Sequence, residues 1–125
     1  MDRTKIELEY IFRASPALLY TFFTTPAALV RWFCDEVDIN GTTYTFVWSG
    51  SEEVAELVED IENELVRFEF EDYEPGEYLE LKMEKSPVTG ETILTITDFC
   101  DADEVDDQRQ LWDSQMKQLR QETGG

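Results

Sequence analysis

The sequence contains no histidine and only two cysteines, Cys34 and Cys100, among its 125 residues. The lack of histidine excludes Ser-His-Asp and Cys-His catalysis, histidine general bases and the usual zinc centres. Two cysteines are too few for a disulfide framework and do not form a metal-type pair. Cys34 is also followed by two acidic residues, whose charge raises the pKa of a thiol and makes it a poor nucleophile. The sequence therefore predicts no catalytic residue, no metal site and no cofactor.

Basic side chains are also scarce, since 10 lysines and arginines stand against 29 aspartates and glutamates. The formal net charge of −19 repels the phosphates of nucleic acids and the head groups of anionic lipids. We therefore expect no binding to nucleic acid or to membrane surfaces. The excess of acid is typical of a soluble surface, and a cation site or a basic protein partner are the alternatives that it leaves.

Long apolar runs are missing, so the sequence shows neither a signal peptide nor a membrane-spanning segment. These absences favour a cytoplasmic, reduced protein. The length is that of one domain, residues 1–125, which buries roughly two thirds of its unfolded surface. Hydrophobic residues make up 42% and aromatic residues 13%, so the chain has enough apolar side chains for a core.

The first part of the chain reads as a strand and two short helices. Residues 5–12, KIELEYIF, alternate apolar and polar positions, which predicts a half-buried strand. Ser15-Pro16 combines an N-cap with a first-turn proline, and the helix that it starts runs to about Thr24. The same signal recurs at Thr25-Pro26 and predicts a second, shorter helix to about Phe33.

Six further strands and one long helix follow. Alternation predicts strands at residues 37–40, 43–50, 53–61, 64–70, 78–85 and 92–99. The segment 53–61 fits the helical period as well, and we choose a strand because its neighbours are strands joined by short turns. The last strand is expected to place on one face Ile93, Thr95, Thr97 and Phe99. Residues 103–122 form the long helix, with a stripe along Val105, Gln108, Trp112, Gln115 or Met116, and Leu119.

The predicted order is one strand, two short helices, six strands and a C-terminal helix, which defines an α+β fold. An antiparallel sheet needs one covered face, and the amphipathic helix is the obvious cover. This order resembles the helix-grip fold of the START and birch-pollen-allergen superfamily. The stretches that carry the resemblance are SPALLYTFFTTPAALVRWF, YTFVWSG, and ITDF leading into the helix with LWDSQMKQL.

Within that superfamily the sequence looks most like the branch related to the activator of the heat-shock-protein-90 ATPase. Members of this branch show a T-x-P-x-x-L-x-x-W unit, which is matched here by Thr24, Pro26, Leu29 and Trp32. A small subgroup of START-like proteins from Bacteroidetes, with no assigned activity, is similar over essentially the whole chain. The resemblance implies that the two short helices form a V that supports the long helix. It also implies a cavity between that helix and the sheet.

Several aromatic residues and one methionine are candidates for the lining of that cavity, since small-molecule sites are mostly apolar and aromatic. The candidate ligand-binding residues are Trp32, Phe33, Tyr44, Phe46, Trp48, Phe68, Phe99, Trp112 and Met116. The alternative is that these side chains fill the core of a small domain and leave no cavity.

Two polar features have competing interpretations. Arg67 interrupts an apolar strand. On the inner face it would clamp a ligand carboxylate or pair with Glu53 or Glu56, and on the outer face it would pair with surface acids. The acidic run at 98–107 lacks the EF-hand spacing, so we interpret it as N-capping of the long helix with a favourable dipole interaction. Binding of a hard cation is the alternative.

The leading functional hypothesis is a non-enzymatic START-like domain that binds a hydrophobic or amphipathic small molecule, as a monomer or a homodimer. The first alternative is a protein-interaction domain, like the co-chaperone domain that it resembles, whose charge of −19 would meet a basic surface. The second alternative is an enzyme of the cyclase or hydrolase type, for which the sequence supplies no motif. The fold alone does not distinguish between these three hypotheses, because it hosts lipid carriers, hormone receptors, cyclases and co-chaperone domains.

Overall fold

The computed structural model describes residues 2–125 and has the predicted order of elements. One strand and two short helices come first: β1 (Arg3–Phe12), α1 (Pro16–Thr24) and α2 (Pro26–Leu29). The remaining strands are β2 (Glu36–Asn40), β3 (Thr43–Trp48), β4 (Ser51–Ile61), β5 (Leu65–Phe70), β6 (Leu79–Lys85) and β7 (Thr92–Asp101). A 3₁₀ turn, η1 (Ala102–Glu104), leads into the long helix α3 (Val105–Thr123). The ambiguous segment 53–61 is a strand, as predicted.

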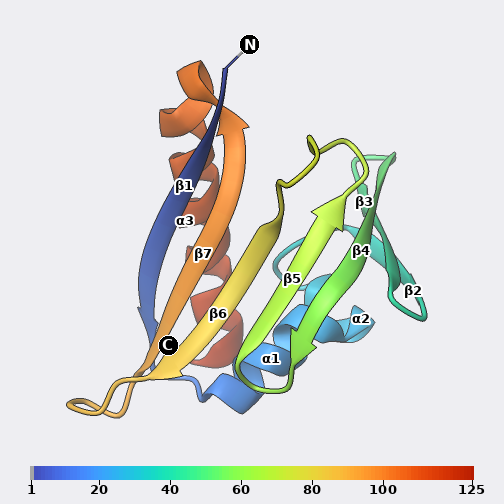
Figure 1. The fold of residues 1–125 in the computed structure, drawn as a ribbon. Helices are drawn as coiled ribbons and strands as arrows, with labels where there is room; N and C mark the ends of the chain where they lie inside the picture. Colours follow the sequence, from blue (N-terminus) through green and yellow to red (C-terminus); the bar gives the residue numbers. More distant parts are fainter. Residues whose placement is uncertain (1) are drawn as a thin grey trace.

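The seven strands form one antiparallel sheet in the order β1-β7-β6-β5-β4-β3-β2. The strands β1 and β2 therefore lie at opposite edges, although only α1 and α2 separate them in sequence (Figure 1). The two short helices carry the chain across one end of the sheet, and the later strands return by successive hairpins until β7 pairs with β1.

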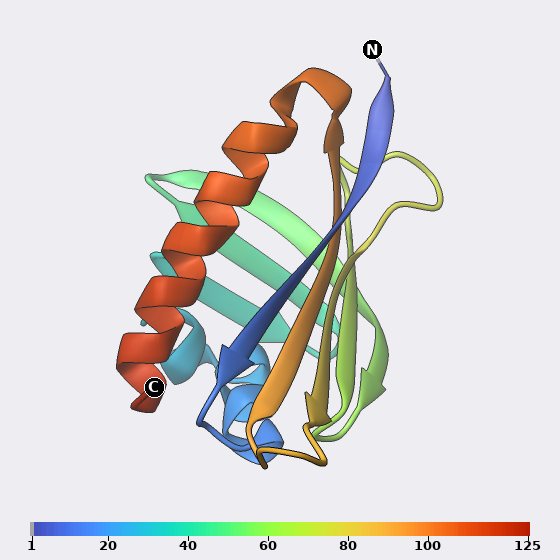
Figure 2. The ribbon, with the colours of Figure 1, turned by 90° about the vertical axis from the view of Figure 1, so that its left-hand side faces the viewer.

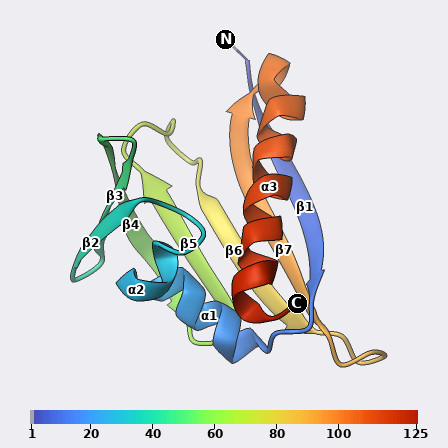
Figure 3. The same ribbon diagram turned by 180° about the vertical axis from the view of Figure 1, so that it is seen from behind.

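The long helix α3 crosses the same face of the sheet on which α1 and α2 lie, and we call this the inner face (Figures 2 and 3). The predicted stripe of α3 faces the sheet, with its centre buried at Trp112, Met116 and Leu119. Strand residues at alternate positions complete the core, for example Leu8, Leu81 and Ile96, which lie side by side on three paired strands. A curved antiparallel sheet that wraps a long C-terminal helix is the helix-grip fold.

The turn between the two short helices depends on local hydrogen bonds. The Ser15 hydroxyl accepts the Leu18 N–H at 3.1 Å and caps α1, as expected from the Ser-Pro pair. The helix α2 ends at Leu29 and is shorter than predicted, because the Phe33 and Cys34 N–H groups both turn back to the Leu29 carbonyl. This tight turn directs the Trp32 ring inward, where its Nε1 donates to the Phe22 carbonyl at 2.9 Å.

The last strand places Ile93, Thr95, Thr97 and Phe99 on one face, as predicted, but this is the outer face, so Phe99 does not line the cavity. In β7 the inward side chains include Leu94, Ile96 and Asp98, whereas the set that contains Phe99 faces outward. Both alternating sets of this strand carry large apolar residues, so the alternation alone does not indicate which face of the strand is buried. The pairing of Ile96 with Leu8 on one side and Leu81 on the other decides the orientation, because both partners are buried.

The acidic run before α3 also differs from its interpretation. The cap positions Asp101 and Glu104 make no side-chain capping hydrogen bond, so the N-capping prediction is wrong. Asp106 and Asp107 do occupy the first turn of α3, where negative charge interacts favourably with the helix dipole. Asp98 belongs to β7 instead of the helix start, and its carboxylate is buried beneath α3.

Candidate ligand-binding pocket

A cavity of about 330 Å³ lies between α3 and the sheet, on the inner face. Its volume is at the lower end of the range of small-molecule sites, roughly 300–1,000 Å³. The wall is formed by Phe33, Trp48, Glu53, Phe70, Tyr73, Leu79, Asp98, Gln108, Leu111, Trp112 and Gln115. The cavity thus combines five aromatic rings with two carboxylates and two amides, and we call it the α3 pocket.

The structure brings three of the nine candidate residues to the α3 pocket: Phe33, Trp48 and Trp112. Five others are buried in the hydrophobic core and are not part of the wall: Trp32, Tyr44, Phe46, Phe68 and Met116. Phe99 lies on the outer face of the sheet, where its ring meets the Tyr78 ring edge-on at 5.3 Å. Most of the candidate side chains therefore fill the core, and three of them line a cavity.

Phe33 is the centre of the aromatic wall. Its ring lies 5.2 Å from the Trp48 ring in an edge-to-face arrangement and 6.3 Å from the Trp112 ring in a stacked one. The Trp48 Nε1 donates to the Phe33 carbonyl at 2.5 Å, which fixes β3 to the turn after α2. Phe70 and Tyr73 form a further aromatic pair in the wall, with ring centroids 5.3 Å apart.

Asp98 is the buried polar group of the pocket, with 1% of its surface exposed. One carboxylate oxygen accepts the Tyr73 hydroxyl at 2.5 Å and the backbone N–H of Phe99 at 2.8 Å. The other accepts Gln108 Nε2 and Trp112 Nε1, each at 3.0 Å. Burial, together with the charge and hydrogen bond of Asp98, raises the pKa of the Tyr73 hydroxyl far above its usual range. The phenol therefore stays protonated and donates to the carboxylate.

Glu53 stands at the exposed rim of the pocket on β4. It is paired with Phe46 across the β3–β4 ladder, which places its side chain on the inner face. Partial burial and the neighbouring charge of Asp72 raise the pKa of the Glu53 carboxyl. Such a shift marks a carboxylate that lacks full solvation at the edge of a cavity.

Sequence reasoning missed most polar members of the wall, although two signals were present. Gln108 and Gln115 stood on the predicted buried stripe of α3, where a polar residue needs a partner. Asp98 interrupted an otherwise apolar strand, but we assigned it to the acidic run that follows. Tyr73 lies in the connection between β5 and β6 and had no periodic signal.

Arg67 lies on the outer face, in agreement with the interpretation as an arginine paired with surface acids. Its guanidinium binds Glu80 at 2.5 Å and lies 3.8 Å from Glu59. It also sits over the Tyr78 ring, 4.3 Å from the centroid. Its alternative pairing with Glu53 or Glu56 on the inner face is therefore wrong.

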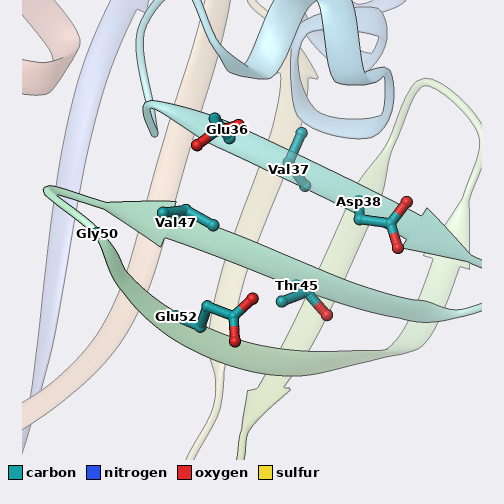
Figure 4. Close-up of a pocket in the computed structure, with 7 residues that line it drawn as sticks. All are labelled: Glu36, Val37, Asp38, Thr45, Val47, Gly50 and Glu52. Carbon is teal, nitrogen blue, oxygen red and sulfur yellow. The ribbon is translucent and has the colours of Figure 1, made fainter.

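A second hollow, of about 540 Å³, lies on the outer face of β2, β3 and β4 (Figure 4). Its lining is Glu36, Val37, Asp38, Thr45, Val47, Gly50 and Glu52. The hollow has no aromatic wall, and its carboxylates are exposed. Glu52 and Glu53 are neighbours on β4, yet Glu52 belongs to this outer hollow and Glu53 to the α3 pocket.

Two further groups bear on chemistry. Burial, with a smaller contribution from Asp35, raises the pKa of the Cys34 thiol to about 11. At neutral pH Cys34 is therefore an un-ionised, weakly nucleophilic thiol. Carboxylate oxygens of Asp101, Asp103 and Glu104 lie within 4.8 Å of one another, and Asp101 also binds Arg3 at 3.1 Å.

Within residues 2–125 no helix is both long and apolar enough to cross a bilayer.

The wrapped helix and the pocket beneath it define a helix-grip domain with an internal site. A family model for the START-like superfamily domain matches residues 1–125. The chain therefore belongs to the START-like superfamily, as its sequence motifs implied.

Two solved structures illustrate the similarity. The NMR structure of BfR322 from Bacteroides fragilis is 40% identical, covers 97% of this chain and 91% of its own, and has a TM-score of 0.69. The Aha1 dimer from Colwellia psychrerythraea is 19% identical, covers 96% of each chain, and has a TM-score of 0.81. The second likeness shows the shared fold. A comparison with curated proteins gave no match.

Proposed function

We propose that this protein is a non-enzymatic binding domain that holds a small amphipathic molecule in the α3 pocket. The observation that carries the proposal is the coexistence of a filled core and a separate cavity. Large side chains such as Phe46 and Met116 are almost completely buried, whereas a cavity of about 330 Å³ lies between α3 and the sheet. An apolar wall with a few convergent polar groups is the usual composition of a small-molecule site.

The START-like family membership supports this proposal, because the helix-grip fold hosts lipid carriers and hormone receptors among its members. Tyr73, Gln108 and Trp112 are hydrogen-bonded to Asp98, so this part of the wall is ordered before a ligand arrives. A preformed site avoids the entropy cost of ordering side chains on binding.

The first test is native mass spectrometry of the freshly purified protein, with a solvent extract of the same sample analysed in parallel. A reproducible extra mass that is released on denaturation supports the proposal. Protein freed of any copurified molecule is then titrated with 3-phenylpropan-1-ol, a small amphipathic probe. Binding in the pocket should change the tryptophan fluorescence, because Trp48 and Trp112 line the wall.

A matched pair of variants places the binding in the pocket. Leu111 stands at the rim and is 52% exposed, so Leu111→Trp should occlude the cavity without disturbing the core. Lys117→Trp adds the same ring at an exposed position of α3 outside the wall and serves as the control. If neither a copurified molecule nor any probe binds, or if the Leu111 variant binds as well as the control, the proposal fails. The protein-interaction hypothesis would then take its place.

A further inference from the structure

The α3 pocket has few hydrogen-bond donors left for a ligand. Its two indole N–H groups are already used, by the Phe33 carbonyl for Trp48 and by Asp98 for Trp112. The Tyr73 hydroxyl is directed to Asp98 as well, and so is one N–H of the Gln108 amide. Most of the donors that would recognise a carboxylate, a phosphate or a carbonyl oxygen are therefore used inside the protein, and only amide N–H groups of Gln108 and Gln115 remain.

Apart from these amide N–H groups, a ligand meets acceptors and ring faces. The Glu53 carboxylate stands at the rim, and the amide groups of Gln108 and Gln115 each offer a carbonyl oxygen. Five aromatic rings form the rest of the wall, and the faces of such rings carry negative electrostatic potential. A positively charged group within about 6 Å of a ring centroid is attracted by this potential.

The charges of the wall have one sign. Two carboxylates, Asp98 and Glu53, line the pocket, and its wall among residues 2–125 includes neither lysine nor arginine. Asp98 takes part in none of the ion pairs formed within the described residues. Its carboxylate accepts four hydrogen bonds, all from neutral donors, so no positive side chain of the wall opposes the approach of a cation.

We propose that the α3 pocket selects a small organic cation, an ammonium group carried on an apolar body. The inference rests on the proposed function, since it names the chemical class of the molecule that this pocket holds. The apolar body packs against Leu79 and the aromatic rings, and the ammonium group points toward the Glu53 rim and the ring faces. Fatty acids and other anions are excluded by the same wall.

The test compares three probes with one body and three head groups: 3-phenylpropylamine, 3-phenylpropan-1-ol and 3-phenylpropanoate. Calorimetric titration at about 0.15 M salt screens the exposed surface charges and leaves the pocket charges effective. We expect the amine to bind about tenfold more tightly than the alcohol, which corresponds to a cation–π and ionic contribution of moderate size. The carboxylate should bind more weakly than the alcohol.

The matched variants are Glu53→Gln and Glu52→Gln. Both remove one negative charge from β4, but only Glu53 faces the pocket. The preference for the amine over the alcohol should fall at least threefold in Glu53→Gln and stay unchanged in Glu52→Gln. Equal effects of the two variants would assign the preference to the overall charge of the protein and overturn the inference.

The outcomes separate the inference from the proposed function. If the alcohol binds as tightly as the amine, the cation inference is wrong while the binding domain stands. If the carboxylate binds most tightly, the inference is also wrong. If the amine binds undiminished to the occluded Leu111→Trp variant, it sits on the acidic surface, and the inference is overturned. If none of the probes binds, the cation inference is wrong, and if in addition no molecule copurifies, the proposed function itself fails.

Discussion

At the scale of single residues, Asp98 joins the fold to the site. Its carboxylate holds Tyr73 from the β5–β6 connection and two side chains of α3, so one buried charge connects three parts of the molecule. Buried carboxylates are retained when several donors satisfy them, and they are costly to disrupt. The residue that shapes the electrostatics of the pocket therefore also positions its walls.

We predict that Asp98→Ala destabilises the protein by about 3 kcal/mol, since it leaves the Tyr73, Gln108 and Trp112 donors buried without their acceptor. Urea unfolding followed by circular dichroism measures the change. Asp103→Ala, at an exposed position, is the control and should change the stability by less than about 0.5 kcal/mol. A loss no larger than that of the control would show that the four hydrogen bonds contribute little.

At the scale of elements, the two short helices differ in how they begin. Both follow the same Ser/Thr-Pro signal, yet Ser15 caps α1 through its hydroxyl and Thr25 makes no side-chain cap for α2. The Thr25 hydroxyl instead donates to the Thr21 carbonyl at 2.8 Å and closes the end of α1. Two equal sequence signals thus have different structural effects.

This difference gives a matched prediction. Ser15→Ala should lower the free energy of unfolding by about 1 kcal/mol, the usual cost of removing an N-cap. Thr25→Ala removes no cap and should cost clearly less. Thermal and urea denaturation of the two variants side by side would measure both losses, and equal losses would mean that the cap at Ser15 does not stabilise α1.

The elements also show what the sequence could predict. The alternation of β1 and the stripe of α3 gave the correct buried faces, because in each most apolar residues lie on one side, with Ile11 and Leu111 as exposed exceptions. The strand β7 has apolar residues on both sides, so its orientation depends on the register with β1 and β6, which no local pattern contains. The pocket wall depends on that orientation, and this is why Asp98 was missed and Phe99 was misplaced.

At the scale of the whole molecule, the main feature is the large excess of negative charge. The protein has 29 acidic and 10 basic side chains, and the ion pairs within residues 2–125 involve four of the basic ones: Arg3, Arg31, Arg67 and Lys82. Most carboxylates therefore repel one another across the surface, and such repulsion opposes the compact state.

We predict that salt stabilises this protein. Raising the ionic strength from about 0.01 to 0.15 M shortens the screening length from about 30 to 8 Å, which weakens the long-range repulsion more than the short ion pairs. The melting temperature should rise by several degrees over this range, in sodium chloride and in potassium chloride alike. A constant or falling melting temperature would mean that the paired charges outweigh the unpaired ones.

The position of β1 in the sheet has a consequence for how the chain comes to be folded. Its residues pair with β7, for example Arg3 with Asp101, so its partner is synthesised after all the other strands of the sheet. Until β7 emerges from the ribosome, β1 has no neighbour and its backbone groups stay exposed as an open edge. Pairing across so long a stretch of chain is slow. We therefore expect β1 to join the sheet late in folding, when β7 is in place and α3, which follows β7 after the η1 turn, covers the inner face.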